Sequence, residues 1–365
     1  MTVSKRFGFA VAALCSALSF APAHAQTKPA PAAPAASAPT TLPFNWEGAY
    51  GRQNILVFPF RPGGRFEQLV TQYTNGTVKI DNKEKLFSIM DSAFAVGDGR
   101  VLMGTQSIAA ASGTYPLLDF GGIPGFFSEI PAGATEYAQA ILDPKMMALL
   151  DNFTKPAGFK VLGSAISMAN NSLWGNKPIR TVADFKGVKM RASGRTQTSA
   201  LRTLGGSPLT LSMAEIEEAL SRGTVDAITT SKSFGAERGL TQMTKFASVW
   251  PITPIFPQFI LINAKAWDKL DQRQKDGLLR ASAHLTTEMA TALEQMNYTY
   301  DLWIKSSKTE LVIPDEAEVR KAMGMMQPVV KEWLETAGPM GKDVLRIAAS
   351  HAKGPTSAMV RDMAK

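Results

Sequence analysis

Residues 182–230 read VADFKGVKMRASGRTQTSALRTLGGSPLTLSMAEIEEALSRGTVDAITT, and this stretch decides the fold. Short apolar runs bounded by glycines alternate in it with segments of helical spacing, a pattern typical of alternating strands and helices. Arg191 ends one of the predicted strands, and α/β folds place their ligand contacts at such strand ends. We predict strands at 188–191, 208–211 and from 225 onward, and helices at 196–204 and 212–222.

The same alternation continues on both sides of this stretch. The Pro/Gly/aromatic segment YPLLDFGGIPGFF at 115–127 is expected to be a loop, and loops of this kind often line clefts. Alternation of strands with helices predicts an α/β chain whose sheet is mostly parallel and covered by helices. Further strands are predicted at 54–60, 77–81, 101–103, 160–164 and 258–263, and further helices at 64–73, 84–96 and 134–150.

A long helix is predicted from Asp271 to about Ser306. Asp271 and Gln274 have the spacing of a capping box, and apolar residues then recur on one helical face. At about 1.5 Å per residue the helix would span roughly 50 Å, so we expect it to brace two domains. A strand at 311–313 and helical segments at 315–334, interrupted near Pro328, follow it. The remainder, to Lys365, is predicted to be helical and mobile towards its end.

The first residues predict export. Lys5 and Arg6 precede an apolar run at 7–20 that is too short to span a bilayer, and Ala23-His24-Ala25 is a small-x-small cleavage site. We therefore expect a signal peptide at 1–25 and a periplasmic protein.

An Ala/Pro-rich segment at 26–41 follows the predicted signal peptide and is expected to be a disordered or polyproline-like tether. The only cysteine, Cys15, lies within the signal peptide. The mature chain is therefore expected to have neither a disulfide nor a thiol nucleophile.

Composition limits the function classes. The 365 residues suffice for two domains, and the net charge of +8 is spread without long Lys/Arg runs or interleaved aromatics. We therefore expect no nucleic-acid partner. The two histidines beyond the signal peptide, His284 and His351, lie in unrelated contexts, and no metal, P-loop, dinucleotide or nucleophile motif occurs. We predict no metal, no cofactor and a binding protein rather than an enzyme.

Arg191 is the residue with the clearest binding chemistry. Its planar guanidinium can pair with a carboxylate through two parallel hydrogen bonds, which in a partly dry cleft anchors an anion strongly. The alternative interpretation is a surface arginine with a salt-bridge partner.

Three stretches resemble the solute-binding proteins of TRAP (tripartite ATP-independent periplasmic) transporters, the DctP family. The segments NKPIRTVADFKGVKMRASG and LGGSPLTLSMAEIEEALSRGTVDA resemble the central signature of that family, and NAKAWDKLDQRQKDGLL resembles the start of its long helix. The resemblance covers residues 44 to about 338.

The resemblance implies a two-domain, periplasmic-binding-protein-like fold with crossing strands and a long helix spanning both domains. Ligand would be held in the interdomain cleft and passed to integral membrane subunits of a TRAP transporter, and we expect a monomer. The first implied domain consists of residues 42–167 and 257–295, and the second of residues 168–256 and 296–345. A C-terminal tail follows at 346–365.

The resemblance also implies site residues. Arg191 corresponds to the carboxylate anchor of the family, Thr230 takes the place of a ligand-binding asparagine, and Asn170 or Asn171 lies nearest to a second arginine found in some members. Apolar walls are predicted, with core packing as the alternative for each residue, at Trp174, Met213, Trp250 and Phe256. One arginine with apolar walls predicts a monocarboxylate with a hydrophobic or aromatic body.

Two other outputs fit the same sequence. A receptor of this fold could feed a periplasmic sensor, or the scaffold could carry an enzyme. Neighbouring transporter genes would favour import, a neighbouring kinase gene would favour sensing, and turnover of a bound acid would favour the enzyme.

Overall fold

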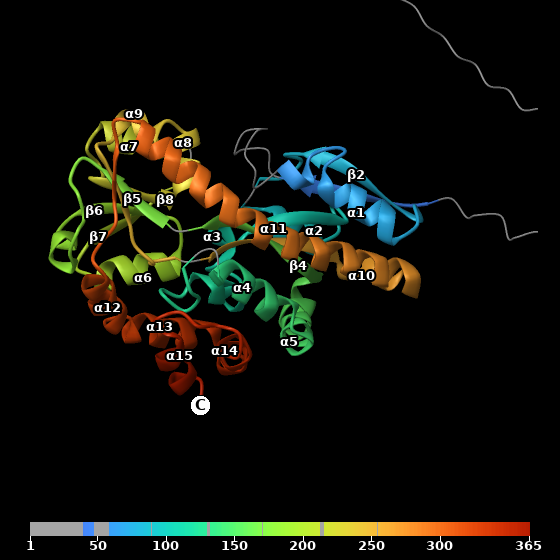
Figure 1. Ribbon diagram of the computed structural model, residues 1–365. Helices are drawn as coiled ribbons and strands as arrows, with labels where there is room; N and C mark the ends of the chain where they lie inside the picture. The colour runs from blue at the N-terminus through green and yellow to red at the C-terminus, as the bar shows by residue number, and fades with distance from the viewer. Residues whose placement is uncertain are drawn as a thin grey trace, which may run out of the picture. The chain divides into compact units, whose positions relative to one another are not determined.

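The computed structural model describes residues 39–46, 58–88, 90–129, 132–169, 171–211, 215–253 and 255–365 (Figure 1). The described chain contains two sheets, one ordered β2-β1-β3-β10-β4 and the other β11-β9-β5-β8-β6-β7. We call each sheet with the helices packed on it the five-stranded lobe and the six-stranded lobe. The prediction of an α/β chain is confirmed, and its strands are divided between two sheets.

The five-stranded sheet is built around a fully buried strand. Strand β10 lies antiparallel between β3 and β4, and all nine of its residues are buried. The parallel strands β1 and β2 extend the sheet beyond β3, and β1 includes the last two residues, 40 and 41, of the predicted tether. The strands are β1 (Thr40–Trp46), β2 (Val78–Glu84), β3 (Met103–Ser107), β4 (Phe159–Ala169) and β10 (Ile255–Asn263).

The six-stranded sheet contains the stretch that decides the fold. Strand β6 lies parallel between β7 and β8, and α6 (Arg195–Thr203) connects β6 to β7, as predicted. Helix α7 (Ile216–Ser221) follows within the helix predicted at 212–222, of which residues 212–214 lie outside the described residues. The strands are β5 (Asn171–Gly175), β6 (Lys189–Ala192), β7 (Ser207–Thr210), β8 (Ala227–Ser231), β9 (Phe246–Val249) and β11 (Glu310–Val312).

Two segments cross between the sheets. Strand β4 of the five-stranded sheet leads directly into β5 of the six-stranded sheet, and the chain returns from β9 to β10 through residues 250–254. The predicted crossing strands are therefore present.

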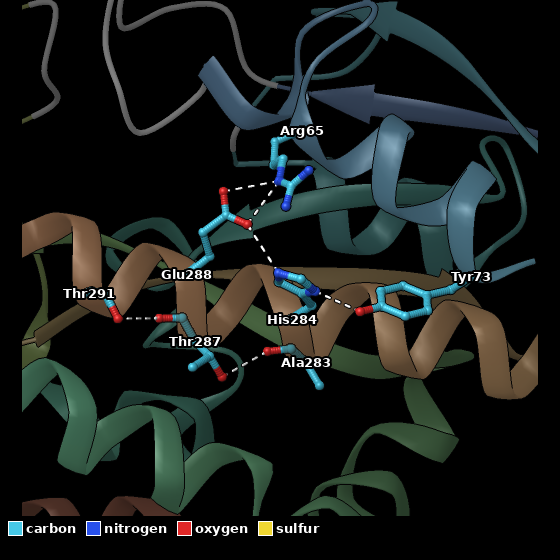
Figure 2. Close-up of polar contacts among 7 residues, drawn as sticks. All are labelled: Arg65, Tyr73, Ala283, His284, Thr287, Glu288 and Thr291. Atoms are coloured by element: carbon cyan, nitrogen blue, oxygen red, sulfur yellow. Dashed lines mark hydrogen bonds and ion pairs between the residues drawn. The ribbon is translucent and has the colours of Figure 1, made fainter.

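Helix α11 (Gln272–Ser306) braces the two lobes, as predicted. The Asp271–Gln274 capping box is formed in both directions. Figure 2 shows its first half tied to α1 (Arg65–Tyr73): Arg65 pairs with Glu288 at 2.8 Å, and the Tyr73 hydroxyl lies 2.7 Å from His284 Nδ1. Its second half packs against α8 (Lys232–Glu237), where the Lys232 ammonium pairs with Asp301 at 2.5 Å. The helix thus contacts elements of both sheets.

Removing the cap of this helix should destabilise the protein measurably. Asp271→Ala leaves the backbone N–H of Gln274 without its side-chain acceptor, and such a loss costs about 1 kcal/mol. Urea unfolding followed by circular dichroism should show the lower midpoint. Asp276→Ala, which removes an exposed acid one turn later, should have less than half the effect; equal effects would contradict the capping role.

Three predicted elements differ from the structure. The helix predicted at 84–96 is only α2 (Ser92–Gly97), because β2 continues to Glu84. The helix predicted at 134–150 is divided into α4 (Ala132–Leu142) and α5 (Pro144–Thr154), since Asp143 caps a new helix that starts at proline. Residues 58–60 form a 3₁₀ turn instead of a strand, and 54–57 lie outside the described residues.

The expected mobile tail is packed against the rest of the protein. The Thr356 hydroxyl donates to the Pro124 carbonyl at 2.7 Å, and Ala352, Val360 and Ala364 are buried. Figure 1 shows the C-terminal helices beside α4, α5 and α6, in agreement with their contacts. These helices are α12 (Glu316–Gly324), α13 (Gln327–Ala337), α14 (Gly341–Ala349) and α15 (Ser357–Met363).

The remaining described elements are short. Among the described residues, none of the helices combines the length and the apolar character that crossing a membrane requires. The short elements are α3 (Ile108–Ala111), α9 (Leu240–Met243), α10 (Ala264–Asp268) and the 3₁₀ helices η1 (Phe58–Phe60), η2 (Pro116–Gly122), η3 (Lys155–Ala157) and η4 (Val182–Phe185).

Candidate functional site

Arg191 is buried and its side chain is held by backbone carbonyls. It is 3% exposed, its Nε donates to the Leu211 carbonyl at 3.0 Å, and its Nη1 donates to the Thr229 carbonyl at 2.9 Å. Leu211 directly follows β7, and Thr229 lies in β8; these are the two strands that flank β6. Because two donors of one planar group are engaged, the orientation of the guanidinium is set. Arg191 is therefore not a surface arginine, as the alternative interpretation had it.

The strand register places three of the predicted site residues on one face of the six-stranded sheet. Arg191 is paired with Ile228, Ile228 with Trp174, and Thr230 with Ser172. Paired residues on neighbouring strands point to the same face. Ser172 Oγ and Trp174 Nε1 on this face are buried without a hydrogen-bond partner in the described part of the chain. The Arg191 face therefore combines a cation with unsatisfied polar atoms.

The predicted apolar walls lie in two different places. Trp174 packs so closely under α8 that a Cβ on Gly235 would lie 2.3 Å from its ring, and it shares a hydrophobic cluster with Phe256 of β10. Trp250 belongs to another cluster, where its Nε1 donates to the Ile179 carbonyl at 2.9 Å and its ring meets Phe185 edge-on. Trp174 and Phe256 thus belong to the same extended core, whereas Trp250 belongs to a different cluster.

The structure describes only one of the three remaining predicted site residues, Asn170, Asn171 and Met213. Asn171 opens β5 opposite Ser231. Asn170 and Met213 lie outside the described residues. Their predicted roles stay predictions.

A polar network that the sequence did not predict ties the first turn of α6 to η2 of the five-stranded lobe and to the crossing segment at 250–254. The Thr196 hydroxyl donates to Asp119 Oδ2 at 2.5 Å, and Gln197 Nε2 donates to the Thr253 hydroxyl at 3.0 Å. The backbone N–H and the hydroxyl of Ser193 both donate to Gln197 Oε1, at 2.7 and 2.9 Å. Since Ser193 lies two residues after Arg191, the network begins at the end of the strand that carries the candidate anchor.

Asp119 is the unusual member of this network. It lies in η2, within the 115–127 segment that was predicted as a loop and is in fact largely buried, and it is itself 7% exposed. Burial raises the pKa of Asp119 to about 7, and the hydrogen bond from Thr196 opposes the rise. The only sequence signal for it was an acid within an otherwise apolar, Pro/Gly-rich segment.

A hollow of about 340 Å³ adjoins the network. Ser112 and Gly113, which follow α3, line it together with Ser193, Gly194 and Thr210 from the six-stranded lobe. Within the described ranges, no group of three or more His, Cys, Asp or Glu side chains is placed to hold a metal ion.

Comparison with protein families identifies the chain. The model of the bacterial extracellular solute-binding proteins, family 7 (DctP), matches residues 64–336. The chain belongs to this family. The resemblance to TRAP solute-binding proteins is confirmed, and the general role of family 7 is transport, with solute-binding proteins that deliver small molecules to membrane components.

Individual relatives are distant. The sialic acid-binding periplasmic protein SiaP of Vibrio cholerae is 27% identical over 176 residues, 45% of this chain and 50% of that protein, so the match spans about half of this curated relative. The C4-dicarboxylate-binding periplasmic protein DctP of Rhodobacter capsulatus is 26% identical over 250 residues, 63% of this chain and 70% of that protein.

A solved structure shows the same fold. DctP7 of Bordetella pertussis, an extracytoplasmic solute receptor crystallised as a binder of pyroglutamic acid, superposes with a TM-score of 0.72 at 19% identity, covering 85% of this chain and 99% of its own. The predicted fold of two α/β domains with crossing strands and a long helix is confirmed.

Proposed function

We propose that this protein is a periplasmic receptor that captures an organic acid between its two domains and delivers it to a TRAP membrane transporter. Arg191 is proposed to anchor the carboxylate, and the protein to release its ligand chemically unchanged. The observation that carries the proposal is a buried guanidinium whose orientation is set by the Leu211 and Thr229 carbonyls.

The physical argument concerns preorganisation. A buried cation is costly unless hydrogen bonds and an anion compensate for its lost hydration. Because two carbonyls already orient the guanidinium, a carboxylate that binds Arg191 has little side-chain entropy left to remove. An arginine held in this way suits a carboxylate better than a neutral sugar.

The class of ligand follows from the surroundings of Arg191 and from the relatives. The named ligands of the relatives above, sialic acid, C4-dicarboxylates and pyroglutamic acid, are all carboxylic acids. Trp174 lies on the Arg191 face of the sheet and supplies an apolar surface there. We therefore propose that the ligand is a monocarboxylate with an apolar or ring-shaped body. It would be held between the first domain, residues 42–167 and 257–295, and the second, residues 168–256 and 296–345.

A ligand panel tests this function. The purified protein is titrated with pyroglutamate, benzoate, succinate, sialic acid and glucose while the tryptophan fluorescence and the melting temperature are recorded. A monocarboxylate with a ring should raise the melting temperature by several degrees at a saturating concentration, because a ligand that binds only the folded state stabilises it. If glucose alone shifts the melt and no acid does, the carboxylate proposal is wrong.

Delivery is tested separately. Proteoliposomes that contain the two membrane subunits of a TRAP transporter should take up the acid identified in the panel only when this protein is present. Uptake at the same rate without the protein would contradict its role in transport, and a mass spectrum showing an altered ligand would revive the enzyme alternative.

A further inference from the structure

The contact between Asp119 and Thr196 joins the two lobes at the start of α6. Asp119 lies in η2, which packs against β10 and α3 of the five-stranded lobe, and Thr196 lies in the first turn of the helix that follows β6. Both residues are at least nine-tenths buried. A separation of the lobes at this place would break the hydrogen bond and expose the carboxyl group to water.

This contact is mechanically close to Arg191. From Arg191 the chain passes through Ala192 to Ser193, whose backbone and side chain hold Gln197, and Gln197 in turn holds Thr253 of the crossing segment. Thr196 and Gln197 are adjacent, so the first turn of α6 is attached to the five-stranded lobe through Asp119 and to the crossing segment through Thr253. The position of the β6 end therefore depends on the docking of this turn.

We propose that Asp119 is a positioning residue: it docks the first turn of α6, and with it the end of the Arg191 strand, against the five-stranded lobe, and it makes this docking stronger in acid than above neutral pH. The expected effect of docking on ligand affinity rests on the proposed function. The docking itself does not depend on that function.

The sign follows from the surroundings of the carboxyl group. Tyr137 from α4, Arg195 from α6 and Glu332 from α13 are the titratable or charged groups that adjoin Asp119 or line the same small cavity within the described chain. The hydrogen-bond donor to Asp119 is the neutral Thr196 hydroxyl, so burial disfavours the carboxylate and raises the pKa of Asp119 to about 7. In the undocked state water would return this pKa towards its usual range.

Linkage then gives the direction of the pH effect. The docked state binds the proton more tightly, so the extra stability of docking is complete below the undocked pKa and is lost as the pH rises through about 7. Between pH 8 and pH 5.5 the docking equilibrium, and with it the affinity for an acid that stays ionised, should increase by up to about thirtyfold. Above pH 8 it should be flat.

A distance measurement tests docking without any ligand. Spin labels are placed at Gln72→Cys on α1 and Ser221→Cys on α7, both exposed, in a chain whose only cysteine, Cys15, is replaced by serine. The wild-type residue at 119 should give one short distance at pH 5.5 and an added longer one at pH 8. Asp119→Asn, which keeps an acceptor for Thr196 and cannot ionise, should give the short distance at both pH values.

The second variant separates positioning from simple structural damage. Asp119→Ala has no acceptor and should give the longer distance at both pH values, so rescue by asparagine is the signature of the hydrogen bond. An unchanged wild-type distance between pH 5.5 and 8, or the same pH change in Asp119→Asn, would overturn the proposal. Titration with pyroglutamate at both pH values adds the affinity; if pyroglutamate binds at neither pH, the proposed ligand class is in question while the distances still decide the docking.

Discussion

Arg191→Ala should weaken binding of the organic acid at least about a hundredfold. Removing one partner of a buried, hydrogen-bonded charge pair costs about 2–5 kcal/mol, and 2.8 kcal/mol corresponds to a factor of about a hundred. Isothermal titration with the acid found in the ligand panel measures the loss. Because Arg191 is 3% exposed and donates to two backbone carbonyls, the variant should also unfold at a lower urea concentration. Binding is therefore compared under conditions in which both proteins are folded.

Two further variants make this result specific. Arg191→Lys keeps the charge but offers a point charge in place of the planar fork, so it should bind at least tenfold more weakly than the natural protein. Arg222→Ala, which removes an exposed arginine of the same lobe whose side chain is 75% accessible, should leave the affinity unchanged. Full affinity in the lysine variant would show that paired geometry at residue 191 is not what binds the acid.

Local signals in the sequence were sufficient for the elements that carry this anchor. Gly187 has a φ of +74°, a conformation that glycine adopts without strain, and it precedes β6 where the strand was predicted. The Asp271–Gln274 capping box marks the start of α11 at the predicted residue. Such signals act over a few residues and do not depend on the rest of the fold, so a single sequence reveals them.

The surroundings of the anchor could not be predicted in the same way. The carbonyl partners of Arg191 lie 20 and 38 residues away, and Asp119 lies 77 residues from Thr196. No periodicity or spacing within either segment encodes which distant segment it will meet. The sequence therefore indicated that Arg191 ends a strand, while its burial and the docking of α6 became visible only in three dimensions.

The C-terminal tail shows the same limit. From the sequence it was predicted to be helical and mobile towards its end. In the structure it packs against distant segments: the backbone N–H of Gly354 donates to the Phe126 carbonyl at 3.1 Å, and that of Thr356 donates to the Gly125 carbonyl at 3.0 Å. The absence of a side chain at Gly354 allows this approach, since a Cβ there would lie 2.2 Å from the Gly125 carbonyl oxygen.

Deleting residues 351–365 should therefore destabilise the protein severely, by at least about 4 kcal/mol. The deletion exposes apolar surface that Val360 covers, worth about 1.5–3 kcal/mol, and leaves the Pro124, Gly125 and Phe126 carbonyls without their donors at about 1–3 kcal/mol each if they stay buried. Domains of this kind have a free energy of unfolding of only about 5–15 kcal/mol. Urea unfolding followed by circular dichroism should show a large fall in the midpoint.

A point variant and a surface variant distinguish packing from mere chain length. Thr356→Val keeps the volume of the side chain and removes the donor to Pro124, so it should cost about 1–3 kcal/mol by itself. Lys353→Ala changes an exposed residue of the same segment and should stay within about 0.5 kcal/mol of the natural protein. A deletion variant that unfolds at the natural urea midpoint would mean that residues 351–365 are a mobile extension, as the sequence alone suggested, and that their contacts contribute nothing to the stability of the fold.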